Sequence, residues 1–337
     1  MINPRKLIQS LYNRMILKAN RGPIGLGLIG VGGWGGANAA NIMRSGRFNV
    51  LGVNDIQEEA ARRFANRFKT KRYEDLEALL AESAIQAVCI TVPNPHHSEL
   101  VKLAADAGKH IFIEKPLASH PDSCGELGRY CEDRGVLLQV GHQTRREPAF
   151  REIKALLESG ELGCPLYAQG IYTMDRRSRK DWRTDAKACP GGSMEQLGVH
   201  LIDVLIYLLG APLESEGWAR NIPTSSDEAD WGAVILRFPG NVRAEVCTSF
   251  SSPKHMRLEM FLEKGCLVTE GKTIEVKYVD GGSKMLRPRG ISGAVSQFQE
   301  FADCIKQEKK PETGAKESAI VMAAVHSMLS GEKAPRS

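Results

Sequence analysis

Three successive residues, Glu114, Lys115 and Pro116, form the part of this sequence best suited to chemistry. They follow an apolar run, Ile111-Phe112-Ile113, which has the pattern of a buried parallel strand. Open α/β sheets bind ligands at the carboxyl ends of such strands, so Lys115 there can hold a reacting group and exchange a proton with it. Pro116 fixes the backbone of the turn. The alternative is that Lys115 is a solvated residue ending an ordinary strand, and the tripeptide alone favours that alternative.

A glycine-rich loop elsewhere in the sequence favours the chemical role of Lys115 over the solvated one. The segment Gly30-Val31-Gly32-Gly33-Trp34-Gly35 has the spacing G-x-G-x-x-G between a predicted strand and a predicted helix. Its first glycine permits a tight turn, its second lets a pyrophosphate approach the backbone, and its third allows close packing of helix on strand. The helix N-terminus then faces the phosphates. The expected dinucleotide contacts are Gly30, Gly32, Gly33, Trp34 and Gly35.

An acidic residue at the end of the second predicted strand supports a dinucleotide site. Asp55 lies twenty residues after Gly35, where a carboxylate is expected on the adenosine ribose 2′-hydroxyl. The same charge would repel a 2′-phosphate, so NAD is favoured, although the Arg62-Arg63 pair on the following helix keeps NADP possible. The alternative role for Asp55 is a helix N-cap.

A third loop reaches the same edge of the predicted sheet. The segment 91–97, TVPNPHH, follows the predicted strand Ala87–Val92 and is stiffened by two prolines. Such a loop could clamp the ribose on the nicotinamide side of a dinucleotide, and a purely structural turn is the alternative. The cofactor contacts expected from it are Thr91, Pro93, Asn94 and His97.

The predicted order of helices and strands differs between the two halves of the chain that carry these residues. From about residue 23 to 141, predicted strands and helices alternate, which indicates a doubly wound parallel sheet. After residue 142, helices Pro148–Ser159 and Met194–Leu209 precede several short strands between Trp231 and Val279, and two helices close the chain at Phe298–Lys309 and Ala315–Ser330. The sequence therefore predicts a Rossmann domain over residues 22–142. Residues 143–331 are expected to form an α+β domain with a mostly antiparallel sheet.

With these motifs assembled, the chain resembles the glucose–fructose oxidoreductase, inositol dehydrogenase and rhizopine-catabolism (Gfo/Idh/MocA) family. The resemblance spans about residues 24–331. It also includes VGHQTRREP at 140–148, DWR at 181–183 and GGSMEQLGVHLID at 191–203. The order and spacing of the motifs carry it, and no single motif does. It implies an NAD(P)-dependent oxidoreductase acting on a sugar, cyclitol or related polyol, assembled as a homodimer or homotetramer.

The resemblance also assigns roles. It implies that Lys115 holds the substrate hydroxyl and assists its proton transfer, with His200 as the second catalytic residue. His200 also fits a satisfied core histidine, because it lies on an apolar helix. Gln143, with Arg145 or Arg146, is implied to shape the cofactor and substrate edge. The implied cofactor contacts are Glu114, Lys115, Gln143, Trp182 and Arg183, and the implied substrate contacts are Lys115, Arg145, Gln196 and His200.

The sequence departs from the family pattern at one position. Many members carry an aspartate four residues before the histidine, and here that residue is Gln196. An amide can bind a sugar hydroxyl but cannot take its proton at neutral pH. The neighbouring Glu195 points about 100° away on a helix, so proton transfer would rest on Lys115 and His200.

Three activities are compatible with this pattern. The first is reversible hydride transfer between nicotinamide and a carbinol carbon. The second is glycoside cleavage by transient oxidation and elimination, with no net redox change. The third, motivated by Gln196, is a cofactor-binding regulator without catalysis.

Net charge, cysteine content and the length of apolar runs limit the binding partners and the cellular compartment that the sequence predicts. The 337 residues carry a net charge of +5, which is too small and dispersed to indicate nucleic acid. The eight cysteines form no C-x-x-C pair, which suits a cytoplasmic protein with reduced thiols and no metal site. No apolar run is long enough for a membrane span. Residues 1–21 have the spacing of an amphipathic helix that packs on the body or a partner subunit, with attachment to a membrane surface as the alternative.

Overall fold

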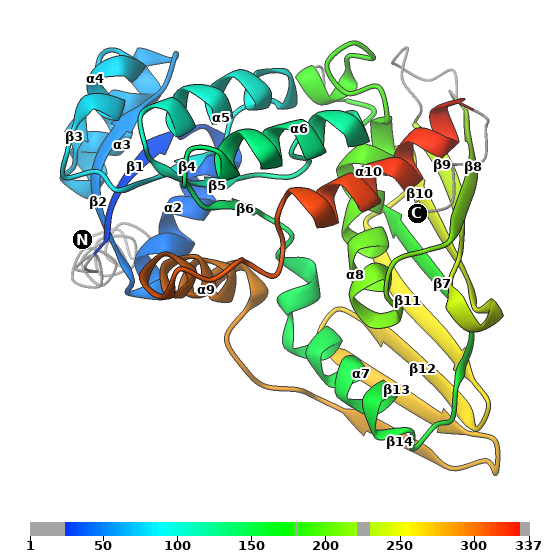
Figure 1. Ribbon diagram of the computed structural model, residues 1–337. Coiled ribbons are helices and arrows are strands. Elements are labelled where there is room, and N and C mark those ends of the chain that lie inside the picture. Colours follow the sequence, from blue (N-terminus) through cyan, green and yellow to red (C-terminus); the bar gives the residue numbers. More distant parts are fainter. Residues whose placement is uncertain (1–23, 179–180, 221–229, 331–337) are drawn as a thin grey trace, which may run out of the picture. The chain divides into compact units, whose positions relative to one another are not determined.

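The computed structural model describes residues 24–178, 181–220 and 230–330 (Figure 1). The N-terminal extension predicted for residues 1–21 lies outside the described residues. The chain forms two compact units, which are treated separately below. The first comprises the described residues up to 117 with 125–141 and 294–315, and the second comprises 118–124, 142–293 and the described residues from 316 on.

The first unit is built on a six-stranded parallel sheet. Its strand order, β3-β2-β1-β4-β5-β6, is that of a doubly wound nucleotide-binding fold, with the direction of winding reversed between β1 and β4. This confirms the predicted Rossmann sheet. The strands are β1 (Ile24–Ile29), β2 (Phe48–Asn54), β3 (Lys71–Arg72), β4 (Ala87–Ile90), β5 (His110–Ile113) and β6 (Leu138–Val140).

Helices cover both faces of this sheet, with α5 and α6 along one face and α2 and α9 along the other (Figure 1). The α9 face is aromatic: Phe298 packs on Phe112 with ring centroids 4.4 Å apart, and Phe301 packs on Phe48 at 5.8 Å. Residues 294–315 therefore fold with the first unit, although their place in the sequence put them in the C-terminal range 143–331. The helices are α2 (Gly33–Ser45), α3 (Glu58–Phe68), α4 (Leu76–Ala81), α5 (His97–Asp106), α6 (Pro121–Glu132) and α9 (Gly293–Gln307).

The second unit contains an eight-stranded sheet in the order β14-β13-β12-β11-β7-β10-β9-β8. Neighbouring strands are antiparallel except β7 and β10, which confirms the mostly antiparallel prediction. The strands are β7 (Pro165–Thr173), β8 (Glu214–Arg220), β9 (Trp231–Arg237), β10 (Arg243–Ser249), β11 (His255–Leu262), β12 (Gly265–Glu270), β13 (Thr273–Tyr278) and β14 (Ser283–Leu286).

Glycines in the strands let helices pack closely on one face of this sheet. A Cβ at Gly170 in β7 would lie 3.1 Å from Leu201 of α8 (Val199–Leu209), and one at Gly217 in β8 would lie 3.0 Å from Met328 of α10 (Ala315–Ser330). The remaining helix is α7 (Pro148–Ser159). Among the described residues, no helix combines the length and apolar character that a membrane crossing requires.

Helix α9 begins at Gly293 instead of the predicted Phe298, because glycine has low helix propensity and its presence hid the start. Helix α2 also begins at a glycine, Gly33. Helix α4 begins at Leu76, where the side chain of Asp75 caps it by accepting from the Ala78 N–H at 2.6 Å.

The long helix predicted over residues 194–209 has two parts. Met194–Gly198 forms a π-helix, and Val199–Leu209 continues as α8. A Cβ at Gly198, the last residue of the π-helix, would lie 2.0 Å from the sulfur of Met194, so a larger residue there would require the Met194 side chain to move. π-Helical turns occur frequently at functional sites.

Candidate functional site

The glycine-rich loop leaves β1 through a turn that only glycine accommodates well. Gly30 has φ of +85°, and a Cβ there would lie 2.4 Å from the carbonyl oxygen of Thr91. A Cβ at Gly35 would lie 2.4 Å from the oxygen of Gly30. The first and last glycines of the motif are therefore needed for the turn and for the close approach of α2.

The two middle glycines have a different environment. A Cβ at Gly32 or Gly33 would meet nothing within 4 Å, so the backbone there borders open space. Gly32 is the N-cap of α2 without any side-chain cap, and the first turn carries no acidic residue. Backbone donors at an uncapped helix N-terminus suit a phosphate group, so the loop fits the pyrophosphate of a dinucleotide.

Asp55 is tied to the glycine-rich loop. Its Oδ2 accepts a hydrogen bond from the Val31 N–H at 2.8 Å, and its Oδ1 accepts one from the Gln57 N–H at 2.8 Å. The N-cap position of α3 is occupied by Gln57, so Asp55 does not have the N-cap role considered as its alternative. Each carboxylate oxygen has a second lone pair for a ribose hydroxyl.

The buried carboxylate of Glu114 connects the loop to the end of β5. Glu114 Oε1 accepts from Trp34 Nε1 at 2.9 Å and from Asn38 Nδ2 at 2.6 Å. Its Oε2 accepts from the Lys115 N–H at 3.3 Å. Burial raises the pKa of Glu114 above its ordinary value, although the Asn38 hydrogen bond and the Lys115 charge oppose that shift. Glu114 thus anchors both the helix that begins the phosphate loop and the turn that carries Lys115.

His97 holds the same turn from the other side. Its side chain is fully buried, with Nδ1 2.7 Å from the Pro116 oxygen and Nε2 3.0 Å from the Val92 oxygen. Burial lowers the pKa of His97 even though both carbonyl contacts raise it. This geometry favours a supporting role for His97, and its predicted cofactor contact stays a prediction. Within the same loop, Asn94 is buried, while Thr91 and Pro93 are half-buried.

In the second unit, the π-helix and α8 carry the other predicted residues. Gln196 is buried and its Nε2 donates to the Cys189 sulfur at 3.4 Å. Glu195 points elsewhere: its carboxylate accepts from the Gly191 N–H at 3.0 Å and from the Ser119 hydroxyl at 3.3 Å. Glu195 therefore stabilises the turn before the helix.

His200 is half-buried and contacts the segment that follows β6. Its Nδ1 lies 3.0 Å from the Thr144 hydroxyl oxygen. Thr144 begins a short 3₁₀ helix, Thr144–Arg146, whose Arg145 is buried and paired with Asp203 on α8. The guanidinium of Arg145 donates to both Asp203 carboxylate oxygens, at 2.9 and 2.6 Å, and its predicted substrate contact stays a prediction.

Three further predicted residues lie in the second unit. The Gln143 Oε1 atom is buried and accepts no hydrogen bond within the described part of the chain, so it could accept one from a ligand. Trp182 and Arg183 share a 3₁₀ turn in which the guanidinium lies 4.3 Å from the centre of the indole ring. Both side chains are half-buried.

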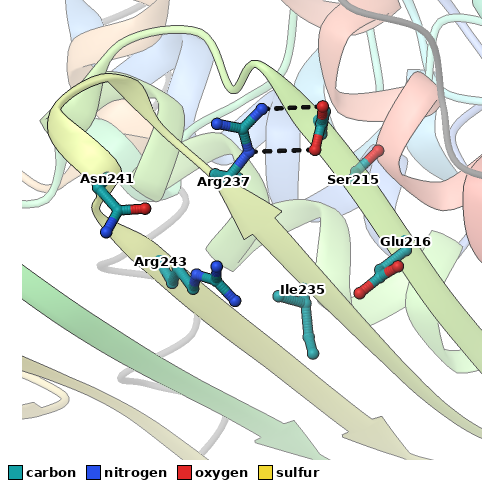
Figure 2. A pocket seen from close by; sticks show the side chains of 7 residues that line it. Ser215, Glu216, Ile235, Arg237, Asn241 and Arg243 are labelled. Carbon is teal, nitrogen blue, oxygen red and sulfur yellow. Dashed lines mark hydrogen bonds and ion pairs between the residues drawn. The ribbon is translucent and has the colours of Figure 1, made fainter.

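A separate pocket lies on the face of the second sheet that is turned away from α8 (Figure 2). It has a volume of about 270 Å³ and contains the Arg237–Glu214 ion pair at 2.8 Å. On β10, Val246 pairs with Gly170 of β7, and both lie on the face of the sheet that packs against α8. The pocket residue Arg243 is an odd number of positions from Val246 along the same strand, so its side chain lies on the face away from α8. The predicted site residues do not line this pocket. Its lining residues are Glu214, Ser215, Glu216, Ile235, Arg237, Asn241 and Arg243.

Each unit thus brings some predicted residues together. In the first, the glycine-rich loop, Asp55, Glu114 and the Lys115 turn are linked by hydrogen bonds. In the second, Gln196 and His200 share one continuous helical segment. Sequence reasoning missed Asn38 and Thr144, which are common polar residues inside longer motifs and had no distinctive spacing of their own.

Two family descriptions match this chain. Residues 24–142 match an oxidoreductase family with an NAD-binding Rossmann fold, and residues 150–268 match the GFO/IDH/MocA C-terminal domain.

Individual proteins are similar over most of their length. The chain is 26% identical to scyllo-inositol 2-dehydrogenase (NAD(+)) of Bacillus subtilis, over 84% of this chain and 86% of that protein. It is also 26% identical to D-xylose 1-dehydrogenase [NADP(+)] of Haloarcula marismortui, over 87% and 86%. The solved structure of levoglucosan dehydrogenase in complex with NADH has a TM-score of 0.86 at 20% identity, over 93% of this chain and 100% of that one. That structure supports the fold alone.

Proposed function

The chain belongs to the GFO/IDH/MocA family of NAD-binding oxidoreductases, and we propose that it oxidises or reduces a carbinol carbon of a sugar, cyclitol or related polyol. The single observation that carries the proposal is the hydrogen-bonded link from the glycine-rich loop through Glu114 to the backbone of Lys115. This link makes a predicted phosphate-binding loop and a predicted proton-transfer residue parts of one rigid arrangement.

The residues of the first unit suit the dinucleotide. Gly32, Gly33 and the start of α2 would hold the pyrophosphate, and Asp55 would accept a hydrogen bond from the adenosine ribose. When bound, the nicotinamide supplies the hydride acceptor or donor. The protein supplies orientation and the proton carrier.

The charge around Asp55 favours NAD over NADP. Asp55 would repel a 2′-phosphate, and the arginines that could offset this repulsion are already occupied. Both Arg62 and Arg63 form ion pairs with Glu59 on the exposed side of α3. We therefore propose NAD as the preferred cofactor.

Lys115 would take the hydroxyl proton during oxidation and return it during reduction. His200 would donate a hydrogen bond to a substrate oxygen. Gln196 stands where an aspartate is common in the family, and its amide can donate or accept a hydrogen bond but cannot remove a proton at neutral pH. The proton chemistry is therefore assigned to Lys115, with His200 in support.

The substrate class rests on the similar proteins, whose names include an inositol dehydrogenase and a xylose dehydrogenase. We propose a polyhydroxylated ring or sugar for this chain as well. We further propose that it acts as a homodimer or homotetramer, which sedimentation of the purified chain would test.

The decisive experiment follows absorbance of the reduced nicotinamide while the purified chain is offered NAD or NADP with scyllo-inositol, D-xylose, levoglucosan and glucose 6-phosphate. With the best substrate, Lys115→Ala should lower kcat by about 10²- to 10⁴-fold and change NAD affinity little. Lys102→Ala, an exposed lysine of the same unit, is the control. Unchanged turnover in Lys115→Ala would remove the mechanism.

The same experiment separates the alternatives. Conversion of a glycoside without net formation of reduced nicotinamide would indicate transient oxidation followed by elimination. Tight NAD binding without turnover of any substrate in a wider panel of polyols, sugars and sugar acids would indicate a regulatory protein.

A further inference from the structure

Thr144 and His200 form a hydrogen bond between the 3₁₀ helix after β6 and α8, with 3.0 Å between Thr144 Oγ1 and His200 Nδ1. We infer that Thr144 is a positioning residue that donates its hydroxyl hydrogen to Nδ1 and thereby holds neutral His200 in the tautomer with its proton on Nε2. The catalytic meaning of this inference rests on the function proposed above, whereas the tautomer itself does not.

The direction of the hydrogen bond follows from the partners of the threonine. A neutral imidazole has one ring nitrogen that donates and one that accepts. His200 Nδ1 is the only acceptor that the Thr144 hydroxyl reaches within the described residues. If Nδ1 carried the proton, the half-buried hydroxyl hydrogen would lose that partner, which costs stability. The hydroxyl therefore donates, and the ring proton is on Nε2.

The same helix that carries His200 also holds Thr144 in place. Arg145, the residue after Thr144, donates from Nε and Nη2 to the Asp203 carboxylate at 2.9 and 2.6 Å and from Nη2 to the Asp203 carbonyl oxygen at 3.3 Å. Both side chains are buried. Two-point pairing of a guanidinium with a carboxylate fixes orientation as well as distance. The 3₁₀ helix is thus locked to α8 one turn away from His200.

A second contact fixes the start of this segment. His142 is buried, and its Nε2 lies 3.2 Å from the Ser318 hydroxyl on α10. Its Nδ1 lies 3.4 Å from Asp203 Oδ1. Thr144 is therefore supported from two helices, and replacing its hydroxyl alone should leave this framework intact.

Two further groups near His200 are compatible with a neutral ring. The Tyr172 ring lies 6.0 Å from the imidazole, between ring centroids. Burial raises the pKa of Tyr172 above its ordinary value, so its phenol is uncharged at neutral pH. The nearby carboxylate of Asp203 is paired with Arg145.

The tautomer separates the roles of the two catalytic candidates. With the proton on Nε2, His200 donates a hydrogen bond through that nitrogen and cannot accept a proton there while it is neutral. During oxidation the substrate O–H bond would break, its proton would pass to the Lys115 amine, and its electron pair would form the second C–O bond as the hydride leaves the carbon for the nicotinamide. His200 would donate a hydrogen bond from Nε2 to a substrate oxygen. His200 is thus a hydrogen-bond donor, and the proton acceptor is Lys115.

The tautomer can be measured directly. Histidine labelled with ¹⁵N in the full chain gives long-range ¹H–¹⁵N correlations that distinguish a protonated ring nitrogen from an unprotonated one. His200→Gln serves only to assign the signal. At a pH where the ring is neutral, the native protein and Thr144→Ser should show the proton on Nε2. Thr144→Val, which has the shape of threonine without the hydroxyl, should show a mixture of both tautomers or the Nδ1 form.

Kinetics give an independent readout. With an accepted substrate, Thr144→Val should lower kcat roughly five- to tenfold, as expected for one lost neutral hydrogen bond, and leave the NAD affinity unchanged. Thr144→Ser should stay within about twofold of the native protein. Far-ultraviolet circular dichroism checks that both variants are folded.

The outcomes distinguish this inference from the proposed function. A native His200 with its proton on Nδ1, or an unchanged tautomer in folded Thr144→Val, would overturn the role of Thr144 even if the enzyme is a polyol dehydrogenase. Full turnover in Lys115→Ala would overturn the proposed mechanism and leave the NMR result standing.

Discussion

Trp34 donates its indole N–H to the buried carboxylate of Glu114 across 2.9 Å, so the glycine-rich loop and the lysine-bearing turn are held by one side chain. Residues 34 and 114 come from different crossovers of the sheet, and their contact joins two strand ends of the nucleotide-binding edge. Asn38, which is almost fully buried, shares the same carboxylate oxygen at 2.6 Å.

We expect Glu114→Ala to weaken NAD binding about tenfold, which corresponds to about 1.4 kcal/mol. The change leaves the buried Asn38 amide without its acceptor and releases the indole of Trp34. Glu114→Gln keeps an acceptor oxygen and should have a smaller effect, and Trp34→Phe should be intermediate. Isothermal titration with NAD measures the series. Trp218→Phe, at an exposed tryptophan of the second unit, is the control. Equal affinities throughout would separate Glu114 from cofactor binding.

His97 should make the stability of the protein depend on pH. Burial lowers its pKa below the ordinary value of 6.5, so between these two values the unfolded chain binds a proton that the folded protein does not. The contribution of neutral His97 to the free energy of unfolding is therefore fully present above pH 6.5. It is lost as the pH falls below 6.5 and through the lowered pKa of the folded protein.

Urea unfolding between about pH 5 and pH 8 would measure this dependence. In His97→Gln the stability loss below neutral pH should become smaller than in the native protein. The adjacent His96 is left unchanged in both proteins, because its charge contributes to the lowered pKa of His97. Identical profiles for the native protein and His97→Gln would show that His97 does not titrate in this range.

The preference for NAD over NADP should weaken when two acidic residues, Asp55 and Glu59, are replaced one after the other. Asp55→Asn removes the charge that repels a 2′-phosphate and keeps one acceptor oxygen for the Val31 or Gln57 N–H. Adding Glu59→Gln releases Arg62 and Arg63 from their ion pairs. We expect the ratio of NADP to NAD affinity to rise roughly tenfold in the single variant and further in the double variant, since each tenfold step is about 1.4 kcal/mol.

Titration of each variant with both dinucleotides tests this expectation. Glu58→Gln is the control, because Glu58 lies on the same helix and pairs with Arg72 instead. A double variant that binds NADP no better than the single one would mean that the two arginines do not reach the 2′-phosphate.

The regular parts of both units could be predicted because their signals are local. Alternating buried strands and helices indicated the parallel sheet, and the strand–glycine loop–helix order located the predicted nucleotide site. Strand β3, only two residues long, carries too little sequence for any pattern. The π-helix was hidden because one additional residue per turn leaves an apolar segment looking like an ordinary helix.

The supporting contacts of the candidate site could not be predicted for a different reason. Asn38 meets Glu114 across 76 positions of the sequence, and Thr144 meets His200 across 56. Such pairs depend on how the elements pack, and a single sequence contains no signal for them. The Arg145–Asp203 pair is another such contact, which joins residues 58 positions apart and had no signal in the sequence.

Replacing only one residue of the Arg145–Asp203 pair should lower the free energy of unfolding strongly, whereas replacing both residues should lower it much less. Both side chains are almost fully buried, 2.6 Å apart. Asp203→Ala would leave a buried guanidinium without its carboxylate, and we expect the free energy of unfolding to fall by about 3–5 kcal/mol. Replacing both residues by apolar ones, Arg145→Met with Asp203→Leu, removes the unpaired charge and should recover much of that loss.

Chemical denaturation of the single and double variants measures the difference. The partly exposed Arg257–Glu270 pair of the same unit, 2.7 Å apart, is the matched comparison. Glu270→Ala should cost at most about 1 kcal/mol, because solvent screens a surface pair. Equal losses at the buried and surface pairs would show that Arg145 is not held by Asp203 as the structure has it. A double variant no more stable than Asp203→Ala would show that the pair does more than neutralise a buried charge.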